Sequence, residues 1–236
     1  MPEMSSPAAI MRDLFAQCRD MDASLNERLQ SFSTAARKYN PAFGDAVERL
    51  IERLRQSGAG EAAPKVGDEM PPFVLPDEDG HIVSLDALIA KGPVAITFHR
   101  GHWCPYCRIN INALARAQRQ IQREGGQIVA VMPDRQQFAA EFKSEAQAEF
   151  PILTDLDNGY ALSLNLVFWV GAEMEKMIAA TGRDMPAYHG NDAWMFPIPA
   201  TFVVGTDGAI TARFVDPDYR KRMEIEDLLG AIRESR

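Results

Sequence analysis

The fold is decided by one stretch of the chain, which reads Thr97-Phe98-His99-Arg100-Gly101-His102-Trp103-Cys104-Pro105-Tyr106-Cys107-Arg108. The apolar, β-branched run 93–99 that leads into it is typical of a buried strand. The segment 105–124 has helical periodicity and ends at Gly125-Gly126, after which residues 127–132 are again strand-like. The stretch therefore lies where a buried strand passes into the helix of a βαβ unit.

Strand and helix patterns continue to alternate on both sides of this unit. Two short strands are expected between residues 73 and 83, and a third at 151–154. Toward the C-terminus, the strand-like runs 200–204 and 209–214 flank Thr206-Asp207-Gly208, a hairpin signal, and an amphipathic helix closes the chain. This order predicts an α/β fold in which helices cover both faces of a central mixed sheet.

The N-terminal part of the chain has a purely helical pattern. Apolar side chains recur with helical spacing from Met11 to Phe32, so we expect an amphipathic helix over the first forty residues, and Pro41 begins a second helix. The glycine- and proline-containing run 57–72 is a linker, which divides the chain into a helical extension, residues 1–63, and a domain, residues 64–236. The apolar stripe of the helices is too wide to face solvent, so they dock on the domain or form a dimer, and we expect a homodimer.

The charge balance restricts the classes of partner. The chain has 25 basic and 33 acidic residues, a net charge of -8, and this excess repels nucleic acid phosphates and anionic membrane surfaces. The N-terminal residues lack the pattern of a secretory signal, and no apolar run approaches the roughly 18 to 20 residues that span a bilayer. Three cysteines are too few for a disulfide scaffold, so we expect a cytoplasmic protein. From the charge and the short apolar runs, we expect no nucleic acid or membrane partner.

Two of the cysteines, Cys104 and Cys107, form a Cys-x-x-Cys pair at the start of the helix. Cys104 takes the N-cap position, where unpaired backbone N–H groups and the helix dipole favour its thiolate, and Arg100 and His102 add positive charge. Such a thiolate is a nucleophile suited to thiol–disulfide exchange and to peroxide reduction. Cys107 lies one turn later on the buried face of the helix and should be the more buried sulfur. We therefore expect Cys104 to attack and Cys107 to resolve.

A Cys-x-x-Cys pair also occurs as half of a structural zinc site, which His99 and His102 could complete. Ligands crowded into nine residues would strain a tetrahedral shell, so we expect neither a metal nor a cofactor. Inert packing is a further alternative, for which an N-cap cysteine is poorly placed. The third cysteine, Cys18, lies on an apolar helix stripe and is expected to be a small core residue.

Three groups of residues carry a resemblance to a known family. They are Arg100-Gly101-His102-Trp103-Cys104-Pro105-Tyr106-Cys107, Pro151-Ile152-Leu153-Thr154-Asp155, and Ile198-Pro199-Ala200-Thr201-Phe202-Val203-Val204 followed by Asp207-Gly208. Together they resemble the peroxiredoxin-like branch of the alkyl hydroperoxide reductase and thiol-specific antioxidant (AhpC/TSA) family of the thioredoxin superfamily. The resemblance covers roughly residues 64–236 and implies a thioredoxin-like fold.

The resemblance also implies an antioxidant oxidoreductase. Cys104 would reduce hydrogen peroxide or an organic hydroperoxide, become a sulfenic acid, form a disulfide with Cys107 and be recycled by a thioredoxin-like donor. In this interpretation Arg100 is catalytic. His102, Trp103 and Pro199 lie around the substrate.

Two positions depart from the family pattern. Typical peroxiredoxins have a Thr or Ser three residues before the reactive cysteine, where this chain has Gly101, and an arginine before the Ala-Thr-Phe strand, where this chain has Pro199. Pro199 resembles the cis-proline that faces the cysteines of thioredoxins. Arg100 is the candidate to replace the family arginine, and Arg213 is a weaker one. The alternative function is a thiol–disulfide oxidoreductase or redox sensor that uses the dithiol without peroxidase activity. A third alternative is a binding or structural module that catalyses no reaction.

The segment 166–197 is longer than a simple strand connection needs to be. Its tryptophans and methionines are expected to be packing residues. The alternative is a hydrophobic flap over Cys104, which predicts a preference for bulky organic hydroperoxides.

Overall fold

The structure is a computed structural model that describes residues 7–235. At its centre is a mixed sheet of five strands in the order β5-β4-β3-β8-β9. The strands are β3 (Val94–Phe98), β4 (Gln127–Met132), β5 (Ile152–Thr154), β8 (Ala200–Val204) and β9 (Ile210–Val215). β3, β4 and β5 are parallel, whereas β8 is antiparallel to β3 and β9 to β8. The predicted α/β fold with a central mixed sheet is confirmed.

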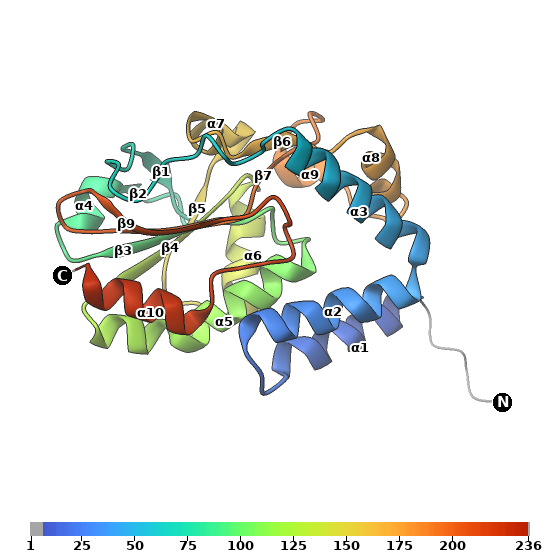
Figure 1. The fold of residues 1–236 in the computed structure, drawn as a ribbon, viewed down its shortest axis with the longest axis horizontal. Helices are drawn as coiled ribbons and strands as arrows, with labels where there is room; N and C mark the ends of the chain where they lie inside the picture. Colours follow the sequence, from blue (N-terminus) through green and yellow to red (C-terminus); the bar gives the residue numbers. More distant parts are fainter. Residues whose placement is uncertain (1–6, 236) are drawn as a thin grey trace.

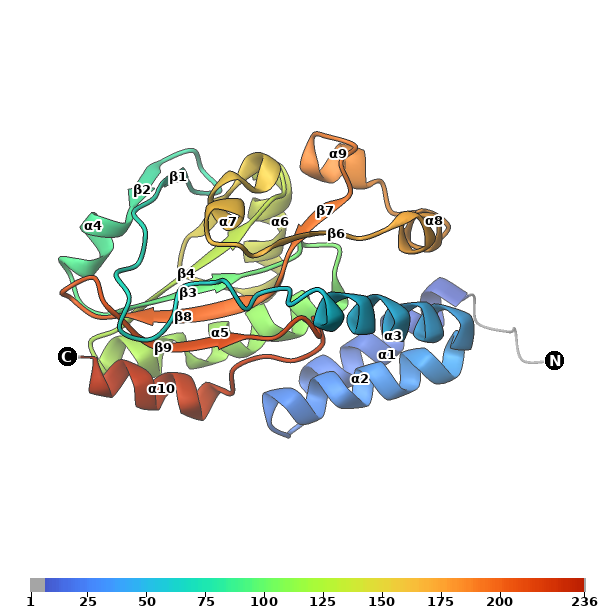
Figure 2. The same ribbon diagram turned by 45° about the horizontal axis from the view of Figure 1, so that its top comes forward.

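Helices cover both faces of this sheet (Figure 1). On one face lie α5 (Pro105–Arg123) and α10 (Ile225–Glu234), and α7 (Gly159–Ser163) lies on the other, as Figure 2 shows from a second direction. α6 (Gln136–Ala146) packs beside β5 and α5. Helices are needed on both faces of the sheet because every residue of β3 is buried, and side chains of a strand alternate between the two faces. On one face, Phe98 of β3 packs against Tyr160 of α7, with ring centroids 5.9 Å apart.

Two small hairpins lie outside the central sheet. β1 (Val74–Pro76) pairs with β2 (Ile82–Ser84), which leads into α4 (Leu85–Ile89). β6 (Val167–Trp169) pairs with β7 (Met195–Pro197), and between them the chain forms α8 (Ala172–Ala179) and α9 (Met185–His189). We call residues 170–194 the excursion. The sequence pattern gives no signal of the β6–β7 pair, because each strand is only three residues long.

Three helices precede the sheet, namely α1 (Pro7–Asp20), α2 (Leu25–Tyr39) and α3 (Pro41–Gln56). The prediction of one helix over the first forty residues is wrong, because the helix is interrupted between α1 and α2. The Ser24 hydroxyl accepts from the Glu27 N–H, and the Glu27 carboxylate accepts from the Ser24 N–H. This capping box begins a new helix. Asn40 caps α3 and Pro41 begins it, as predicted.

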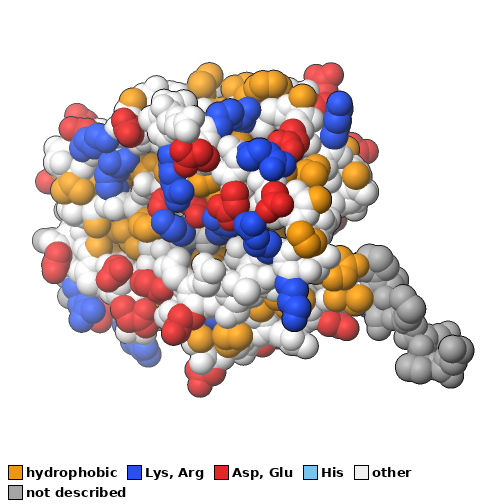
Figure 3. All heavy atoms as spheres, turned by 45° about the vertical axis from the view of Figure 1, so that its right-hand side comes forward, with side chains coloured by type: hydrophobic (Ala, Val, Ile, Leu, Met, Phe, Trp, Pro, Cys, Tyr) orange, Lys and Arg blue, Asp and Glu red, His pale blue; other side chains and the backbone are white. Residues whose placement is uncertain are grey.

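The N-terminal helices dock on α5 and α8. Phe32 of α2 packs edge-on against Tyr106 of α5 with ring centroids 5.2 Å apart. α3 lies beside α8, where Arg49 pairs with Glu173 at 2.5 Å. Figure 3 shows side chains of both charges interspersed on this side of the molecule. No helix among residues 7–235 is long and apolar enough to cross a membrane. The homodimer stays a prediction.

Candidate active site

The Cys-x-x-Cys pair lies at the junction of β3 and α5, where the sequence places it. β3 ends at Phe98, a short loop follows, and Cys104 takes the N-cap position with φ of -88° and ψ of 117°. Pro105 begins the helix, for which its fixed φ is suited and its missing N–H costs nothing. The Cys104 side chain makes no regular capping hydrogen bond, so other groups must also stabilise the sulfur.

Both thiols are free, and the two cysteines are 1% and 0% exposed. Burial raises the pKa of Cys104, but the Cys107 thiol, the Arg100 guanidinium and the Cys107 backbone N–H outweigh burial and lower this pKa to about 5. The pKa of Cys107 is raised well above its usual value by burial, by its hydrogen bond to Cys104 and by the charge of Cys104. The pair therefore keeps its proton on Cys107 and its negative charge on Cys104.

Two buried arginines supply positive charge to the sulfurs. Nη1 of Arg100 lies 4.0 Å from Sγ of Cys104, and Nη2 of Arg222 donates to Sγ of Cys107 at 3.4 Å. Both arginines are 2% exposed, and neither forms an ion pair with a carboxylate of residues 7–235. Because an unpaired buried cation is costly, the Cys104 thiolate is the natural counter-ion of this site.

Three aromatic rings enclose the Arg100 guanidinium. Its central carbon lies 3.9 Å from the ring centroid of Tyr219, 4.9 Å from that of Trp103 and 5.2 Å from that of Phe196. The faces of these rings partly replace water around the cation. The structure thus brings the sequence-predicted Trp103 into contact with the sequence-predicted Arg100.

Gly101 cannot be replaced by the Thr or Ser of typical peroxiredoxins. Its φ is +137°, and a Cβ atom would lie 2.5 Å from Nε1 of Trp103 and 2.6 Å from Oδ1 of Asp134. Both the backbone conformation and the space therefore require glycine. The departure from the family pattern has a physical cause in the neighbours of the loop.

His102 belongs to a buried polar cluster. Its Nδ1 lies 2.6 Å from Oδ2 of Asp134, its backbone N–H donates to the same oxygen at 2.8 Å, and Nε2 of His189 lies 3.1 Å from Oδ1. Burial raises the pKa of Asp134, but its hydrogen bonds to the two histidines leave this pKa below its usual value. The carboxylate of Asp134 holds this cluster just before α6, which begins at Gln136.

Two further sequence candidates, Pro199 and Arg213, differ from what the sequence suggests. The peptide bond before Pro199 is trans, so the likeness to a cis-proline does not hold, although Pro199 is buried between β7 and β8. Arg213 donates to the Gly60 carbonyl at 3.3 Å and is not brought to the sulfurs. Arg100 is therefore the arginine that the structure places at Cys104.

The zinc alternative finds no support in the positions of the histidines. His99 is fully buried, its Nε2 lies 3.0 Å from the Thr97 hydroxyl, and burial together with Arg222 lowers its pKa to about 3. Among residues 7–235, no three or more His, Cys, Asp or Glu side chains are arranged so that they could hold a metal ion. Cys18 is 3% exposed and burial raises its pKa, as for a core residue.

Cys104 is inaccessible in this conformation. The sequence predicts that Cys107 is the more buried sulfur, but the two cysteines are almost equally buried, at 0% exposure for Cys107 and 1% for Cys104. Nε of Arg183 donates to the Trp103 carbonyl at 3.3 Å, so the excursion is bonded to the loop that carries Cys104. A cavity of about 460 Å³ opens elsewhere, between α2, α3 and Arg220. A substrate reaches the sulfur only after a local displacement.

Sequence reasoning missed Asp134 and Arg222. β3 and β4 are parallel, so their carboxyl ends lie side by side, and a polar residue just after β4 belongs near the Cys-x-x-Cys loop. That rule could have found Asp134. Arg222 lies 115 residues from Cys107, in an irregular loop whose sequence carries no signal.

The chain is similar both to the AhpC/TSA family and to a thiol-disulfide oxidoreductase. A sequence model of the AhpC/TSA family matches residues 66–213. The thiol-disulfide oxidoreductase ResA of Bacillus subtilis is 29% identical over 130 residues, which cover 52% of this chain and 72% of ResA.

Solved structures show the same fold. Peroxidoxin BcpB of Mycobacterium tuberculosis superposes with a TM-score of 0.56 and 20% identity, over 73% of this chain and 98% of that protein. The reduced 2-Cys peroxiredoxin of Plasmodium vivax superposes with a TM-score of 0.55 and 16% identity, over 72% and 94% of the two chains. The fold is therefore thioredoxin-like, as expected.

Proposed function

Since the chain belongs to the AhpC/TSA family of oxidoreductases, we propose that it is a thiol-dependent peroxidase that reduces a small hydroperoxide. Cys104 is the nucleophile and Cys107 the resolving thiol. Arg100 is the cation beside the reacting sulfur. A thioredoxin-like dithiol donor returns the disulfide to the reduced state.

The observation that carries this proposal is the placement of the Cys104 sulfur beside a buried arginine that has no carboxylate partner within residues 7–235. With its pKa lowered to about 5, Cys104 is almost entirely a thiolate at pH 7. The thiolate, not the thiol, attacks peroxides. The reduced protein is thus prepared for nucleophilic attack without a separate base.

The first step transfers two electrons from Cys104 to the peroxide. The sulfur attacks one peroxide oxygen, so that an S–O bond forms and the O–O bond breaks. The leaving hydroxide or alkoxide takes up a proton and departs as water or an alcohol, and Cys104 becomes a sulfenic acid. Nη1 of Arg100, 4.0 Å from the sulfur, stabilises the negative charge that moves toward the leaving oxygen.

The second step joins the two cysteines. Cys107 loses its proton and attacks the Cys104 sulfur, an S–S bond forms, and the S–O bond breaks. The departing hydroxide takes up the proton that Cys107 lost, which gives water. The donor dithiol then supplies two electrons and two protons to the disulfide.

Burial of the sulfur favours a small oxidant. Cys104 is 1% exposed, and a bulky organic hydroperoxide would need a large opening to reach it. Hydrogen peroxide needs only a small one. We therefore favour hydrogen peroxide over the bulky organic hydroperoxides that the flap hypothesis predicts.

Thiol–disulfide exchange is the second candidate. It is favoured by Gly101, which leaves no room for a peroxide-binding hydroxyl, and by the similarity to ResA. In this reaction the same Cys104 thiolate would attack a disulfide sulfur of a substrate, and Cys107 would release the mixed disulfide.

Rapid mixing distinguishes the two candidates. The reduced protein is mixed with hydrogen peroxide or with oxidised glutathione, and tryptophan fluorescence is followed, because Trp103 adjoins the site. The proposal predicts oxidation by peroxide that is faster than that of free cysteine and absent in Cys104→Ser. Peroxide oxidation no faster than that of free cysteine, with rapid oxidation by the disulfide, would establish the second candidate instead.

A further inference from the structure

The loop 216–224, which connects β9 to α10, is fastened to the start of α2. Oδ1 of Asn26 accepts from the Arg222 N–H at 3.1 Å, and Nδ2 of Asn26 donates to the Arg222 carbonyl at 2.8 Å. The Glu224 carboxylate accepts from the N–H groups of Leu25 and Asn26 at 3.1 and 2.9 Å. One side chain of α2 thus binds both backbone groups of Arg222, and the loop in return caps α2.

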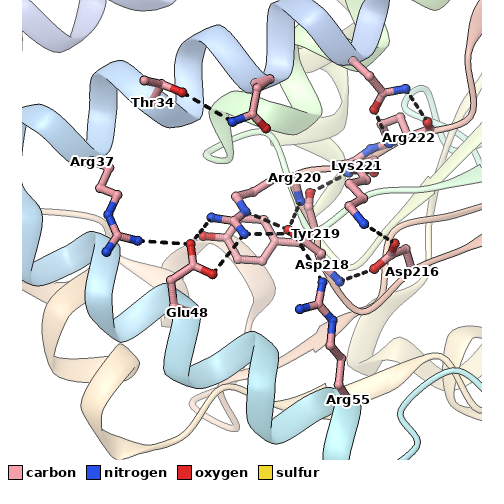
Figure 4. Close-up of polar contacts among 12 residues, drawn as sticks. Thr34, Arg37, Glu48, Arg55, Asp216, Asp218, Tyr219, Arg220, Lys221 and Arg222 are labelled. Carbon is pink, nitrogen blue, oxygen red and sulfur yellow. Dashed lines mark hydrogen bonds and ion pairs between the residues drawn. The ribbon is translucent and has the colours of Figure 1, made fainter.

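A second attachment joins the loop to α3 (Figure 4). Glu48 accepts from Nη1 of Arg220 at 2.7 Å, and Nε of Arg220 donates to Asp218 at 2.7 Å. Arg55 of α3 lies 3.8 Å from the same Asp218 carboxylate, which is nearly buried. The loop is therefore held from two sides by the N-terminal helices.

This fastened loop presents the Arg222 guanidinium to the resolving cysteine. Nη1 of Arg222 donates to the carbonyls of Tyr219 and Lys221, each at 2.6 Å, and Nη2 donates to Sγ of Cys107 at 3.4 Å. The Arg100 backbone N–H donates to the same sulfur at 3.3 Å. Two donors, one of them charged, converge on a thiol that is neutral in the reduced protein, an arrangement suited to a thiolate.

We propose that Arg222 is a catalytic residue of the resolving step, which holds Cys107 as a thiolate once Cys104 has been oxidised, and that Asn26 is the positioning residue that keeps Arg222 in place. The inference rests on the proposed function, because it needs a sulfenic acid at Cys104. The Cys107 thiolate attacks that sulfur, the S–S bond forms, and the S–O bond breaks. Hydroxide leaves with the proton that Cys107 released, as water.

The electrostatics of the pair explain why the resolving thiol is activated second. In the reduced protein, burial, the hydrogen bond to Cys104 and the charge of Cys104 all raise the pKa of Cys107. A neutral sulfenic acid at Cys104 carries no such charge, so the charge of Cys104 no longer opposes Arg222 and burial alone is left to oppose it. His99 also lies near Arg222, but its pKa, lowered to about 3 by burial and by Arg222, keeps it neutral. Attack by Cys104 is thereby ordered before attack by Cys107.

Asn26 and Arg222 lie outside the part of the chain that matches the family model. Asn26 precedes and Arg222 follows the matched residues 66–213. The N-terminal helices thus have a role in the chemistry that the family core alone does not supply.

The test separates the two steps in the full-length protein. Wild type, Arg222→Met, Arg222→Lys and Asn26→Ala are mixed with one equivalent of hydrogen peroxide. The rate of Cys104 oxidation is read from tryptophan fluorescence, and the lifetime of the sulfenic acid from dimedone trapping and mass spectrometry. Arg213→Met is the matched control, because Arg213 also binds a backbone carbonyl but does not contact either sulfur.

We expect Arg222→Met to oxidise Cys104 within about threefold of the wild-type rate and to resolve the sulfenic acid at least about tenfold more slowly, because a buried charge-assisted hydrogen bond is lost. Excess peroxide should then convert more Cys104 to sulfinic acid. Arg222→Lys should restore part of the resolving rate, and Asn26→Ala should slow the same step.

Resolution at the wild-type rate in Arg222→Met would overturn the role of Arg222. If that variant does not fold, a wild-type resolving rate in a folded Asn26→Ala protein, or equal slowing in Asn26→Ala and Arg213→Met, would overturn the proposal as well. Failure of the wild type to form any sulfenic acid would instead overturn the proposed function, and the two failures are thus distinguishable.

Discussion

Replacing Arg100 by methionine is expected to raise the pH at which Cys104 ionises. The guanidinium lies 4.0 Å from the sulfur and is buried. At an effective dielectric constant of about 20, two unit charges at this distance attract by about 4 kcal/mol. This energy corresponds to about three pH units in the titration midpoint, which Arg222 and entering water reduce to about two.

The magnitude is large enough to measure against the starting value. Since the pKa of Cys104 is about 5, the shift would bring its midpoint close to neutrality and leave about half of the protein as thiolate at pH 7. The assay is the ultraviolet absorbance of the thiolate against pH, in a Cys107→Ser background whose hydroxyl still donates to Cys104. Arg116→Met is the control, because Arg116 is exposed and pairs with Asp20. An unchanged midpoint in the Arg100 variant would refute the assignment of this arginine as the partner of the thiolate.

Three further predictions concern the same site. Gly101→Thr is expected to lower the free energy of unfolding by about 2 to 4 kcal/mol, because its Cβ would meet Trp103 and Asp134, and urea denaturation would detect this loss. Asp134→Asn is expected to cost about 3 kcal/mol, since two histidines lose their buried anion, and a cost below about 1 kcal/mol would contradict a charged Asp134. The Cys104 thiolate has its pKa lowered to about 5 in the folded protein, so the stability that it contributes is present above the unfolded value of about 8.5 and is lost as the pH falls through about 5. The free energy of unfolding of the reduced protein, measured relative to Cys104→Ser, should therefore fall by a few kcal/mol over this range, and a constant difference would contradict the ionisation.

Local sequence signals were sufficient for the scaffold of the site. The buried run before His99 and the N-cap cysteine followed by Pro105 predict the junction of β3 and α5, and the structure has it there. The capping box at Ser24 and Glu27 is also a local signal, and it would have predicted the break between α1 and α2. Patterns within one helix or one junction can therefore be read from the chain directly.

The environment of the sulfurs depends on tertiary contacts that no local pattern encodes. The need for glycine at position 101 follows from Asp134 and Trp103, which approach it only in the folded protein. Arg222 reaches Cys107 because Asn26, close to the other end of the chain, holds its backbone. The burial of Cys104 likewise depends on how the excursion and the loop 216–224 pack. Residue types alone led to Cys104 as the candidate nucleophile and to Arg100 beside it, but not to Arg222, Asp134 or the burial of the sulfur.

The central claim is that Cys104 is oxidised by peroxide and is then resolved by Cys107. Intact-protein mass spectrometry after one equivalent of hydrogen peroxide tests it directly. The wild type should lose two hydrogens as a disulfide forms, Cys107→Ser should gain one oxygen at Cys104, and Cys104→Ser should remain unchanged. An unmodified wild type, or oxygen gained equally by Cys104→Ser, would contradict the claim.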